Sequence, residues 1–135
     1  MKIINVNTHA RNEFVDITRE IEKIVTSSGL SEGACLVYVP HTTAGVMINE
    51  NADPDVMHDI DDFLRRMVPK SSNFVHMEGN SDAHIKSGLA GPSILVPISK
   101  SSLALGRWQG IYFAEFDGPR HRSVYIAMLR GAVND

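Results

Sequence analysis

Cysteine is nearly absent from this chain of 135 residues, which contains a single one, Cys35. An intrachain disulfide is therefore excluded. Because Cys35 lies inside the apolar run from Ala34 to Val39, we expect a buried, unreactive thiol rather than a nucleophile. A chain of this length buries about two-thirds of the surface that its unfolded form exposes. It therefore needs neither a disulfide nor a metal ion to be stable.

Positive charge is also scarce, since 13 Lys and Arg residues stand against 16 Asp and Glu residues and give a net charge of −3. This balance provides no basic surface for nucleic acid and no polybasic segment for an anionic membrane. No apolar stretch approaches the roughly 20 residues that span a bilayer, and the first five residues lack the core of a signal peptide. We expect a cytoplasmic protein that contacts neither nucleic acid nor membrane.

Repeats, low-complexity tracts and linkers are missing as well, so residues 1–135 are predicted to form a single domain. Alternating or continuous apolar residues predict strands at 2–8, 34–39, 46–48, 93–98, 108–116 and 122–129. The run 34–39 is apolar almost throughout, which is typical of a strand covered on both faces. The last two strands are predicted to form an antiparallel pair around a bend at 117–120.

Two principal helices are expected. The first follows an N-cap at Asp16 or Thr18 and ends at Gly29, which suits the left-handed C-terminal position. The second follows an N-cap at Asp53, carries Pro54 at its first position and ends before Pro69. Its predicted buried stripe consists of Val56, Ile60, Phe63, Leu64 and Met67. Strands outnumber helices and most links are short, so we predict an α+β fold built on a mainly antiparallel sheet or sandwich.

The segment 76–86 is the richest in polar side chains. Six of them occupy every second position: His76, Glu78, Asn80, Asp82, His84 and Lys86. In an extended segment all six point to one side. Such a face is either a solvated loop edge or a site lined for a metal ion or a charged substrate, because these groups are costly to desolvate. Histidine and carboxylate suit a divalent ion.

Two further polar segments follow apolar strands. The sequence His41-Thr42-Thr43-Ala44-Gly45 forms either a simple turn or an anion site made of hydroxyl and backbone N–H groups. In the segment 49–54, helix capping accounts for Asp53 but not for Glu50, which is predicted to point into a cleft. His58 lies off the apolar stripe and is expected at the surface.

A fourth segment, 106–110, contains Trp108, the only tryptophan. Trp108 is either a core or interface residue or a wall for a planar ring, with Gln109 hydrogen-bonded to the edge of that ring. Arg120, His121 and Arg122 flank a turn and are expected to be solvated, with Arg120 able to reach a phosphate.

Together the segments 41–45, 49–54, 78–87 and 106–110 resemble the YjbQ-type family, described as secondary thiamine-phosphate synthases. The resemblance covers about residues 14–129, and only Arg107 departs from it, standing where a small hydroxyl residue is expected. The resemblance implies a strand-rich α+β subunit that forms a homotrimer. It also implies a reaction, regarded as weak in the family, that joins hydroxymethylpyrimidine diphosphate to thiazole phosphate and releases diphosphate.

That reaction suggests a role for each polar group. The departing diphosphate must be neutralised, and the pyrimidine cation must be surrounded by oriented dipoles. We expect the catalytic residues to be His41, Glu50, Asp82 and His84. We expect the substrate to contact Thr42, Thr43, Asn49, Asn80, Lys86, Ser87, Trp108 and Gln109. A divalent ion, Mg²⁺ or Zn²⁺, is expected to use ligands from Glu50, Asp53, His76, Glu78 and His84.

Other functions remain open at this stage. A metal-dependent hydrolase would use His41, His76 and His84 as ligands, and a non-enzymatic trimer would only bind a small phosphorylated metabolite. The chain lacks a P-loop and a dinucleotide fingerprint, so no nucleotide cofactor is expected. Because the four segments lie far apart in a small domain, we predict a site at or near a subunit boundary.

Overall fold

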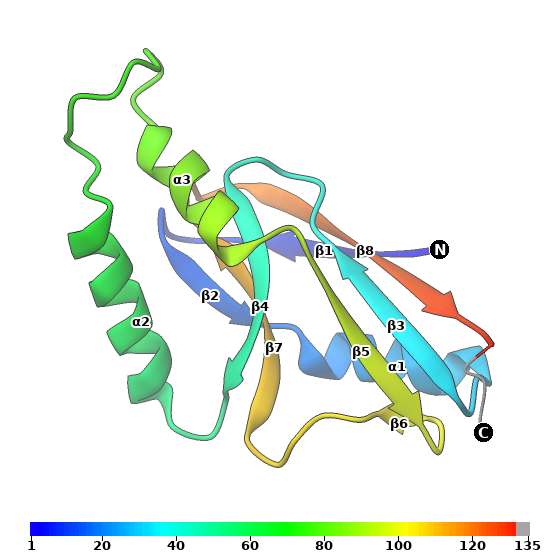
Figure 1. Ribbon diagram of the computed structural model, residues 1–135. Coiled ribbons are helices and arrows are strands. Elements are labelled where there is room, and N and C mark those ends of the chain that lie inside the picture. Colours follow the sequence, from blue (N-terminus) through cyan, green and yellow to red (C-terminus); the bar gives the residue numbers. More distant parts are fainter. Residues whose placement is uncertain (132–135) are drawn as a thin grey trace.

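The computed structural model describes residues 1–131, which contain eight strands and three helices (Figure 1). The strands are β1 (Lys2–Asn7), β2 (Glu13–Asp16), β3 (Gly33–Tyr38), β4 (Ala44–Glu50), β5 (Ser93–Ser99), β6 (Ser102–Leu103), β7 (Gln109–Glu115) and β8 (His121–Leu129). The helices are α1 (Thr18–Ser28), α2 (Pro54–Met67) and α3 (Ser81–Ala90). Within these residues, no helix combines the length and the apolar character that a membrane crossing needs.

The strands form two antiparallel sheets. The five-stranded sheet has the order β1-β8-β3-β5-β6, and the three-stranded sheet has the order β2-β7-β4. Figure 1 shows α2 and α3 on the side of the three-stranded sheet, while α1 lies behind the five-stranded sheet. The predicted α+β class with mainly antiparallel sheets is therefore confirmed.

The predicted pairing of the last two strands is wrong. Both edges of β7 are occupied, since β2 pairs with one and β4 with the other, while β8 pairs with β1 and β3 in the other sheet. The link 116–120 thus carries the chain from one sheet to the other. A short polar link between two apolar strands is the usual sign of a hairpin, and here it instead connects the two layers.

The core lies between the two sheets and α1. Its fully buried members include Ile21 and Val25 of α1, Val37 of β3 and Phe113 of β7. Cys35 is buried in the same core, and burial raises the pKa of its thiol to about 11. The predicted burial of Cys35 is therefore confirmed, and a thiol with a pKa this high favours an unreactive residue, because it carries almost no thiolate at neutral pH.

The outer face of the five-stranded sheet is apolar and lacks a cover within residues 1–131. Directly paired residues of an antiparallel sheet point to the same side, which places Ile3, Tyr125 and Tyr38 in one row and Leu36 and Leu95 in the next. The rings of Tyr38 and Tyr125 stack at 6.3 Å between centroids. The prediction that strand 34–39 is covered on both faces is therefore wrong within one chain, because Tyr38 is exposed.

The first two helices form where the sequence predicts. Gly29 has the left-handed φ of 73° at the end of α1. The N-cap of α1 is Ile17 and not the predicted Asp16 or Thr18, although the Asp16 carboxylate accepts from the backbone N–H of Thr18 at 2.9 Å. The Asp53 carboxylate accepts from the N–H of Asp55 at 2.9 Å, and Pro54 opens α2. These caps satisfy N–H groups that have no partner inside the helix.

The buried stripe of α2 differs from the prediction. Met57 is its buried residue, whereas Phe63 and Met67 are exposed. Helix α2 packs on β4 over part of its length. An amphipathic pattern identifies an apolar face but does not show whether the same chain covers it.

The third helix was not predicted. The extended geometry expected for 76–86 is wrong, because α3 begins at Ser81. Glycine and serine are poor helix formers. The sequence pattern therefore does not indicate a helix here, because the segment contains Gly79, Ser81, Ser87 and Gly88. The helix is held by packing on β4, where the Ser87 hydroxyl donates to the carbonyl of Ala44 at 2.7 Å.

Candidate functional site

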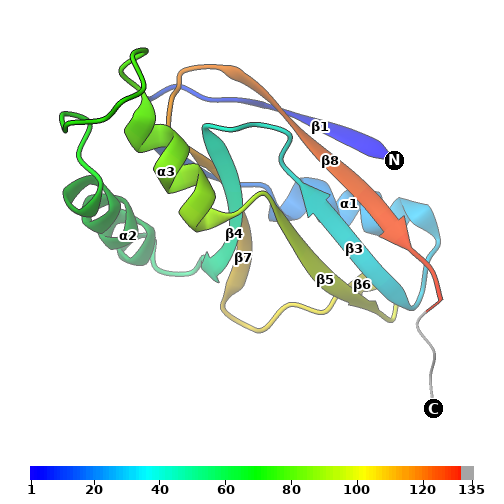
Figure 2. The same ribbon diagram turned by 45° about the horizontal axis from the view of Figure 1, so that its top comes forward.

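A polar hollow lies where the 41–43 loop, the N-terminal end of α3 and the start of β8 meet. Figure 2 shows α3 alongside β4, with its first turn close to the link between β7 and β8. The hollow has a volume of about 370 Å³. We call it the His41–His84 hollow, and its lining residues are Pro40, His41, Thr42, Thr43, Glu78, Asn80, His84, Asp117, Arg120 and Arg122. Of the four predicted segments, 41–45 and 78–87 each contribute some residues here and 49–54 and 106–110 contribute none, while the 117–122 link is an addition.

The imidazole of His41 has a fixed hydrogen-bonding role. The backbone N–H of Ser123 donates to its Nε2 at 3.0 Å, so Nε2 carries a lone pair and the proton lies on Nδ1. Burial, followed by the nearby charge of Arg122, lowers the pKa of His41 below its usual value. A neutral His41 is therefore a donor through Nδ1, and neither of its nitrogens is free to bind a metal ion while this bond holds.

A buried ion pair supports the wall of the hollow. The guanidinium of Arg122 donates to the Glu115 carboxylate through Nε at 2.8 Å, and to the Thr43 hydroxyl through Nη2 at 2.8 Å. The Thr8 hydroxyl also donates to Glu115 at 2.9 Å. Burial raises the pKa of Glu115, but the hydrogen bonds from Arg122, Asp117 and Thr8 outweigh it and hold the pKa below its usual value. The carboxylate is therefore ionised.

The expectation that Arg122 is solvated is wrong, since its side chain is buried. Glu115 was missed altogether. The available signal was a carboxylate at the end of the otherwise apolar strand 108–116, because a charge in such a strand needs a buried partner. Arginine seven residues later is that partner.

The opposite wall is held by Asp117. Its carboxylate accepts from Arg120 Nη2 and from Asn80 Nδ2, each at 3.0 Å. Asn80 Oδ1 is buried and has no donor within residues 1–131. A ligand with an N–H or O–H group would satisfy that oxygen.

His84 reaches the hollow from α3. Its ring lies edge to face with that of His76, at 5.3 Å between centroids, and His76 Nε2 is 3.7 Å from a carboxylate oxygen of Glu78. Even so, no group of three His, Cys, Asp or Glu side chains in residues 1–131 could hold a metal ion. The residues of this hollow therefore do not form a metal site within one chain, and the expected divalent ion stays a prediction.

The other polar residues of α3 face away from His84. Positions two apart on a helix differ by about 200° in direction, whereas positions four apart share a face. Asn80 and His84 thus line one hollow, while Asp82 and Lys86 line another beside Arg11. Ser87 binds the Ala44 carbonyl. Within one chain, Asp82, Lys86 and Ser87 therefore do not line the same hollow as His84.

The remaining predicted residues gather at the far end of β4. Glu50 pairs directly with Gln109 in the sheet, and the N–H of Asn51 donates to the carbonyl of Trp108 at 3.0 Å. Strand β4 separates this end from the 41–43 loop by roughly 20 Å at about 3.4 Å per residue. Within one chain the structure does not bring Glu50, Trp108 and His84 together.

Local hydrogen bonds occupy several of these groups. The Glu50 carboxylate accepts from the N–H of Ala52 at 3.1 Å, and Asn49 Oδ1 accepts from the N–H of Glu50 at 2.7 Å. Gln109 Oε1 accepts from the N–H of Gly106 at 2.8 Å. Asp53 caps α2. The indole of Trp108 is 54% exposed and carries the Arg107 guanidinium at 4.8 Å from its ring, so it is not a core residue.

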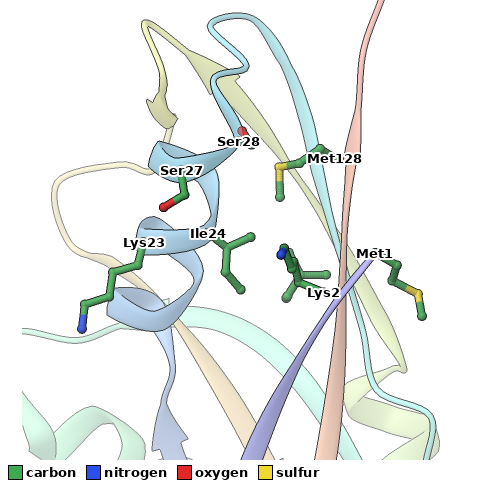
Figure 3. Close-up of a pocket in the computed structure, with 8 residues that line it drawn as sticks. Met1, Lys2, Lys23, Ile24, Ser27, Ser28 and Met128 are labelled. Carbon is green, nitrogen blue, oxygen red and sulfur yellow. The ribbon is translucent and has the colours of Figure 1, made fainter.

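A further hollow between α1 and the five-stranded sheet contains none of the predicted residues. Its volume is about 530 Å³. Figure 3 shows Ile24 of α1 and Met128 of β8 extending into it, whereas Lys23 extends away. It has no histidine or carboxylate among its lining residues.

Comparison with known proteins places this chain among close relatives. The family model described as "UPF0047 protein YjbQ-like" matches residues 2–131. A UPF0047 protein of Methanocaldococcus jannaschii is 53% identical over 92% of this chain and 90% of its own length. The UPF0047 protein YugU of Bacillus subtilis is 48% identical over 96% of this chain and 98% of its own length.

Solved structures of this family have the same fold. A crystal structure of a protein of the YjbQ/UPF0047 family from Clostridium acetobutylicum superposes with a TM-score of 0.94 at 48% identity, covering 96% of this chain and 100% of that one. A YbjQ-like protein from Sulfolobus solfataricus, whose printed description is "of unknown function", gives a TM-score of 0.91 at 34% identity over 95% of this chain and 94% of that one.

Proposed function

The chain belongs to the YjbQ-like UPF0047 family, and from that premise we propose that the His41–His84 hollow binds a phosphorylated small molecule and supports thiamine-phosphate synthesis. In this reaction hydroxymethylpyrimidine diphosphate and thiazole phosphate are joined and diphosphate is released. The reaction class comes from the sequence resemblance. The observation that supports it most is the convergence of hydroxyl, guanidinium and imidazole donors in one small hollow.

Several donors suit a phosphate group. The Thr42 hydroxyl and the Nδ1–H of His41 line the hollow, and Arg120 and Arg122 contribute guanidinium groups. Hydrogen bonds to charged oxygens are about twice as strong as neutral ones. The ion pair with Glu115 holds Arg122 in a fixed orientation, so the site needs little reorganisation when an anion enters.

The proposed chemistry balances without an additional reactant. The bond between the pyrimidine methylene carbon and diphosphate oxygen breaks, and its electron pair leaves with diphosphate. The ring nitrogen of the thiazole then forms a new bond to that carbon. Arg120, Arg122 and His41 would stabilise the negative charge of the leaving group, and His84 would donate a proton to it. Asn80 Oδ1, which has no donor within residues 1–131, would accept from the pyrimidine amine.

Self-association forms part of the proposal. The outer face of the five-stranded sheet presents exposed apolar side chains, namely Ile3, Tyr38, Leu95 and Leu129, and such faces are typical of protein interfaces. The resemblance indicates a trimer. A neighbouring subunit would then supply the distant cluster of Glu50, Trp108 and Gln109 to a shared site. A cytoplasmic location, predicted from the sequence, belongs to the same proposal.

The hydrolase alternative has less support. It needs His41 as a metal ligand, but Nε2 of His41 accepts the Ser123 N–H. A trimer that binds a phosphorylated metabolite without turnover needs no metal ligand and fits the same geometry. The experiment must therefore separate binding from catalysis.

The test is a two-substrate assay with purified protein, with thiamine phosphate detected as its fluorescent oxidised product and substrate binding measured by calorimetry. We expect product with the native chain and at least a tenfold lower rate with His84→Asn. Thr42→Ala should weaken the binding of the diphosphate substrate. His58→Asn is the control, since His58 lies exposed on α2. Binding without product, unchanged by divalent ions, would overturn the transferase and leave the binding trimer. Absence of binding would overturn both.

A further inference from the structure

A second polar hollow lies on the opposite side of α3, between that helix, the end of α2 and the 10–12 segment. Its volume is about 480 Å³. We call it the Arg11–Lys86 hollow, and its lining residues are Ala10, Arg11, Asn12, Arg65, Lys70, Asp82 and Lys86. None of these lines the His41–His84 hollow, so the two spaces are distinct.

Buried charge is concentrated in this hollow. Asp82 is fully buried and accepts two hydrogen bonds from Arg11, at 2.9 and 3.0 Å. The Lys86 side chain is 2% exposed, and its ammonium lies 3.4 Å from the same carboxylate. An ammonium has three donors, and a single contact of 3.4 Å is a weak one. Lys86 is therefore a buried cation whose hydrogen-bonding capacity is largely unused.

The charges in the hollow do not balance. Two cations, Arg11 and Lys86, face one carboxylate, Asp82. Lys70 adds a third cation, and it forms no ion pair with another residue in 1–131. Arg65 also lines the space, although its guanidinium is paired with Asp61 at 3.0 Å. A buried cation in excess of its partners is costly unless an anion compensates it.

One further group indicates the nature of that anion. Asn12 lines the hollow, and its Oδ1 is buried without a donor in the part of the chain that the structure describes. An acceptor oxygen beside several cations suits a ligand that carries both negative charge and a hydroxyl proton. A phosphate group protonated on one oxygen has both.

We propose that the Arg11–Lys86 hollow is a second anion site, in which Lys86, Lys70 and Arg65 bind a phosphate group and the P–OH of that phosphate donates a hydrogen bond to Asn12 Oδ1. The inference does not depend on the proposed function, because it involves different residues and a different face of α3. The same site would accept inorganic phosphate or the phosphate of a small metabolite.

The test uses inorganic phosphate as the probe, at constant ionic strength, with thermal unfolding and calorimetry as readouts. Replacing Lys86 itself risks misfolding, so the variants are Arg65→Ala and Lys70→Ala at the exposed rim. Arg66→Ala is the matched control, since Arg66 is paired with Asp62 as Arg65 is with Asp61 but does not line the hollow. We expect Arg65→Ala and Lys70→Ala each to weaken phosphate binding about tenfold, and Arg66→Ala to leave it unchanged.

A Thr42→Ala, Arg120→Ala double variant weakens phosphate binding at the His41–His84 hollow, so that binding at the Arg11–Lys86 hollow can be measured alone. If the inference is right, this variant still binds phosphate, and the loss caused by Lys70→Ala persists in it. Equal phosphate binding in Lys70→Ala, Arg65→Ala and the native chain would overturn the second site. This conclusion would hold whether or not the protein synthesises thiamine phosphate. Sulfate, which has no proton at neutral pH, should bind more weakly than phosphate, and equal binding would overturn the role of Asn12.

Discussion

His41 shows how a backbone contact can determine the chemistry of a side chain. The Ser123 N–H fixes the neutral tautomer of the ring, and burial together with Arg122 keeps its pKa low. Motif and residue type identified His41 as a functional candidate. They did not reveal which nitrogen carries the proton, because that depends on a strand located 82 residues away in the sequence.

The lowered pKa of His41 predicts a pH dependence of stability. The unfolded chain protonates this histidine near pH 6.5, whereas the folded chain does so only at lower pH. Stability is therefore fully present above about pH 6.5 and is lost as pH falls toward the folded pKa, by less than about 1.4 kcal/mol per pH unit. His41→Gln retains an acceptor for Ser123 and should flatten the curve between pH 7 and 5. Urea unfolding at each pH measures this.

His58→Gln is the control for that series, because His58 is exposed on α2. It should leave the pH dependence as it is. A His41→Gln curve that follows the native one at every pH would contradict the fixed neutral tautomer.

Among single residues, only part of the set that the motifs of the resemblance predicted to share one site lies together in one chain. His41, Thr42, Thr43, Glu78, Asn80 and His84 do meet in one hollow. Sequence reasoning failed for Arg122 and Glu115, whose pairing crosses from one sheet to the other. The sequence offered only the carboxylate at the end of an apolar strand as a signal, and it did not show that the partner lies in the other sheet.

At the scale of elements, α3 depends on the glycine that faces it. A Cβ added to Gly45 of β4 would lie 2.7 Å from the carbonyl oxygen of Gly91 and 3.0 Å from Ala90 Cβ. The strand and the helix approach each other closely only because that atom is missing. The caps that revealed α1 and α2 lie within their own segments, whereas the support for α3 comes from β4. This is why the sequence pattern predicted two helices correctly and missed the third.

Two glycine substitutions test this dependence. Gly45→Ala should destabilise the fold by about 1–3 kcal/mol, since the backbone atoms it meets cannot move aside easily. Gly88→Ala is the matched change within α3, where an added Cβ meets nothing within 4 Å. It should stabilise the helix by about 0.5–1 kcal/mol. Denaturant unfolding of both variants gives the two free energies. Equal effects of the two substitutions would show that α3 does not depend on this close approach.

For the whole molecule, the main unexplained feature is the apolar outer face of the five-stranded sheet. The excess of strands over helices and the short links predicted the fold class, and the strand positions were largely right. The pattern of apolar residues did not reveal the division into two sheets or the exposure of one of them. Alternation shows that a strand has an apolar face, but it does not identify the surface that covers it.

This face predicts the assembly state. Leu95 is 60% exposed on β5, so a charge there should be tolerated by the isolated subunit and not by an interface. We expect the native chain to elute with the mass of three chains, and Leu95→Glu to elute as a folded monomer, in size-exclusion chromatography with light scattering. Met77→Glu is the control, because Met77 is exposed in the segment before α3. A native monomer, or a trimer that survives Leu95→Glu, would contradict the placement of the interface.

Helix α3 separates the two polar hollows and contributes side chains to both. Asn80 and His84 point to one side, and Asp82 and Lys86 to the other. A rigid helix cannot turn one of these faces without turning the other, so a rotation that brings His84 closer to its ligand must also displace the ammonium of Lys86. Any ligand that shifts α3 from one hollow would therefore change the affinity of the other hollow, and the two effects would be equal in size.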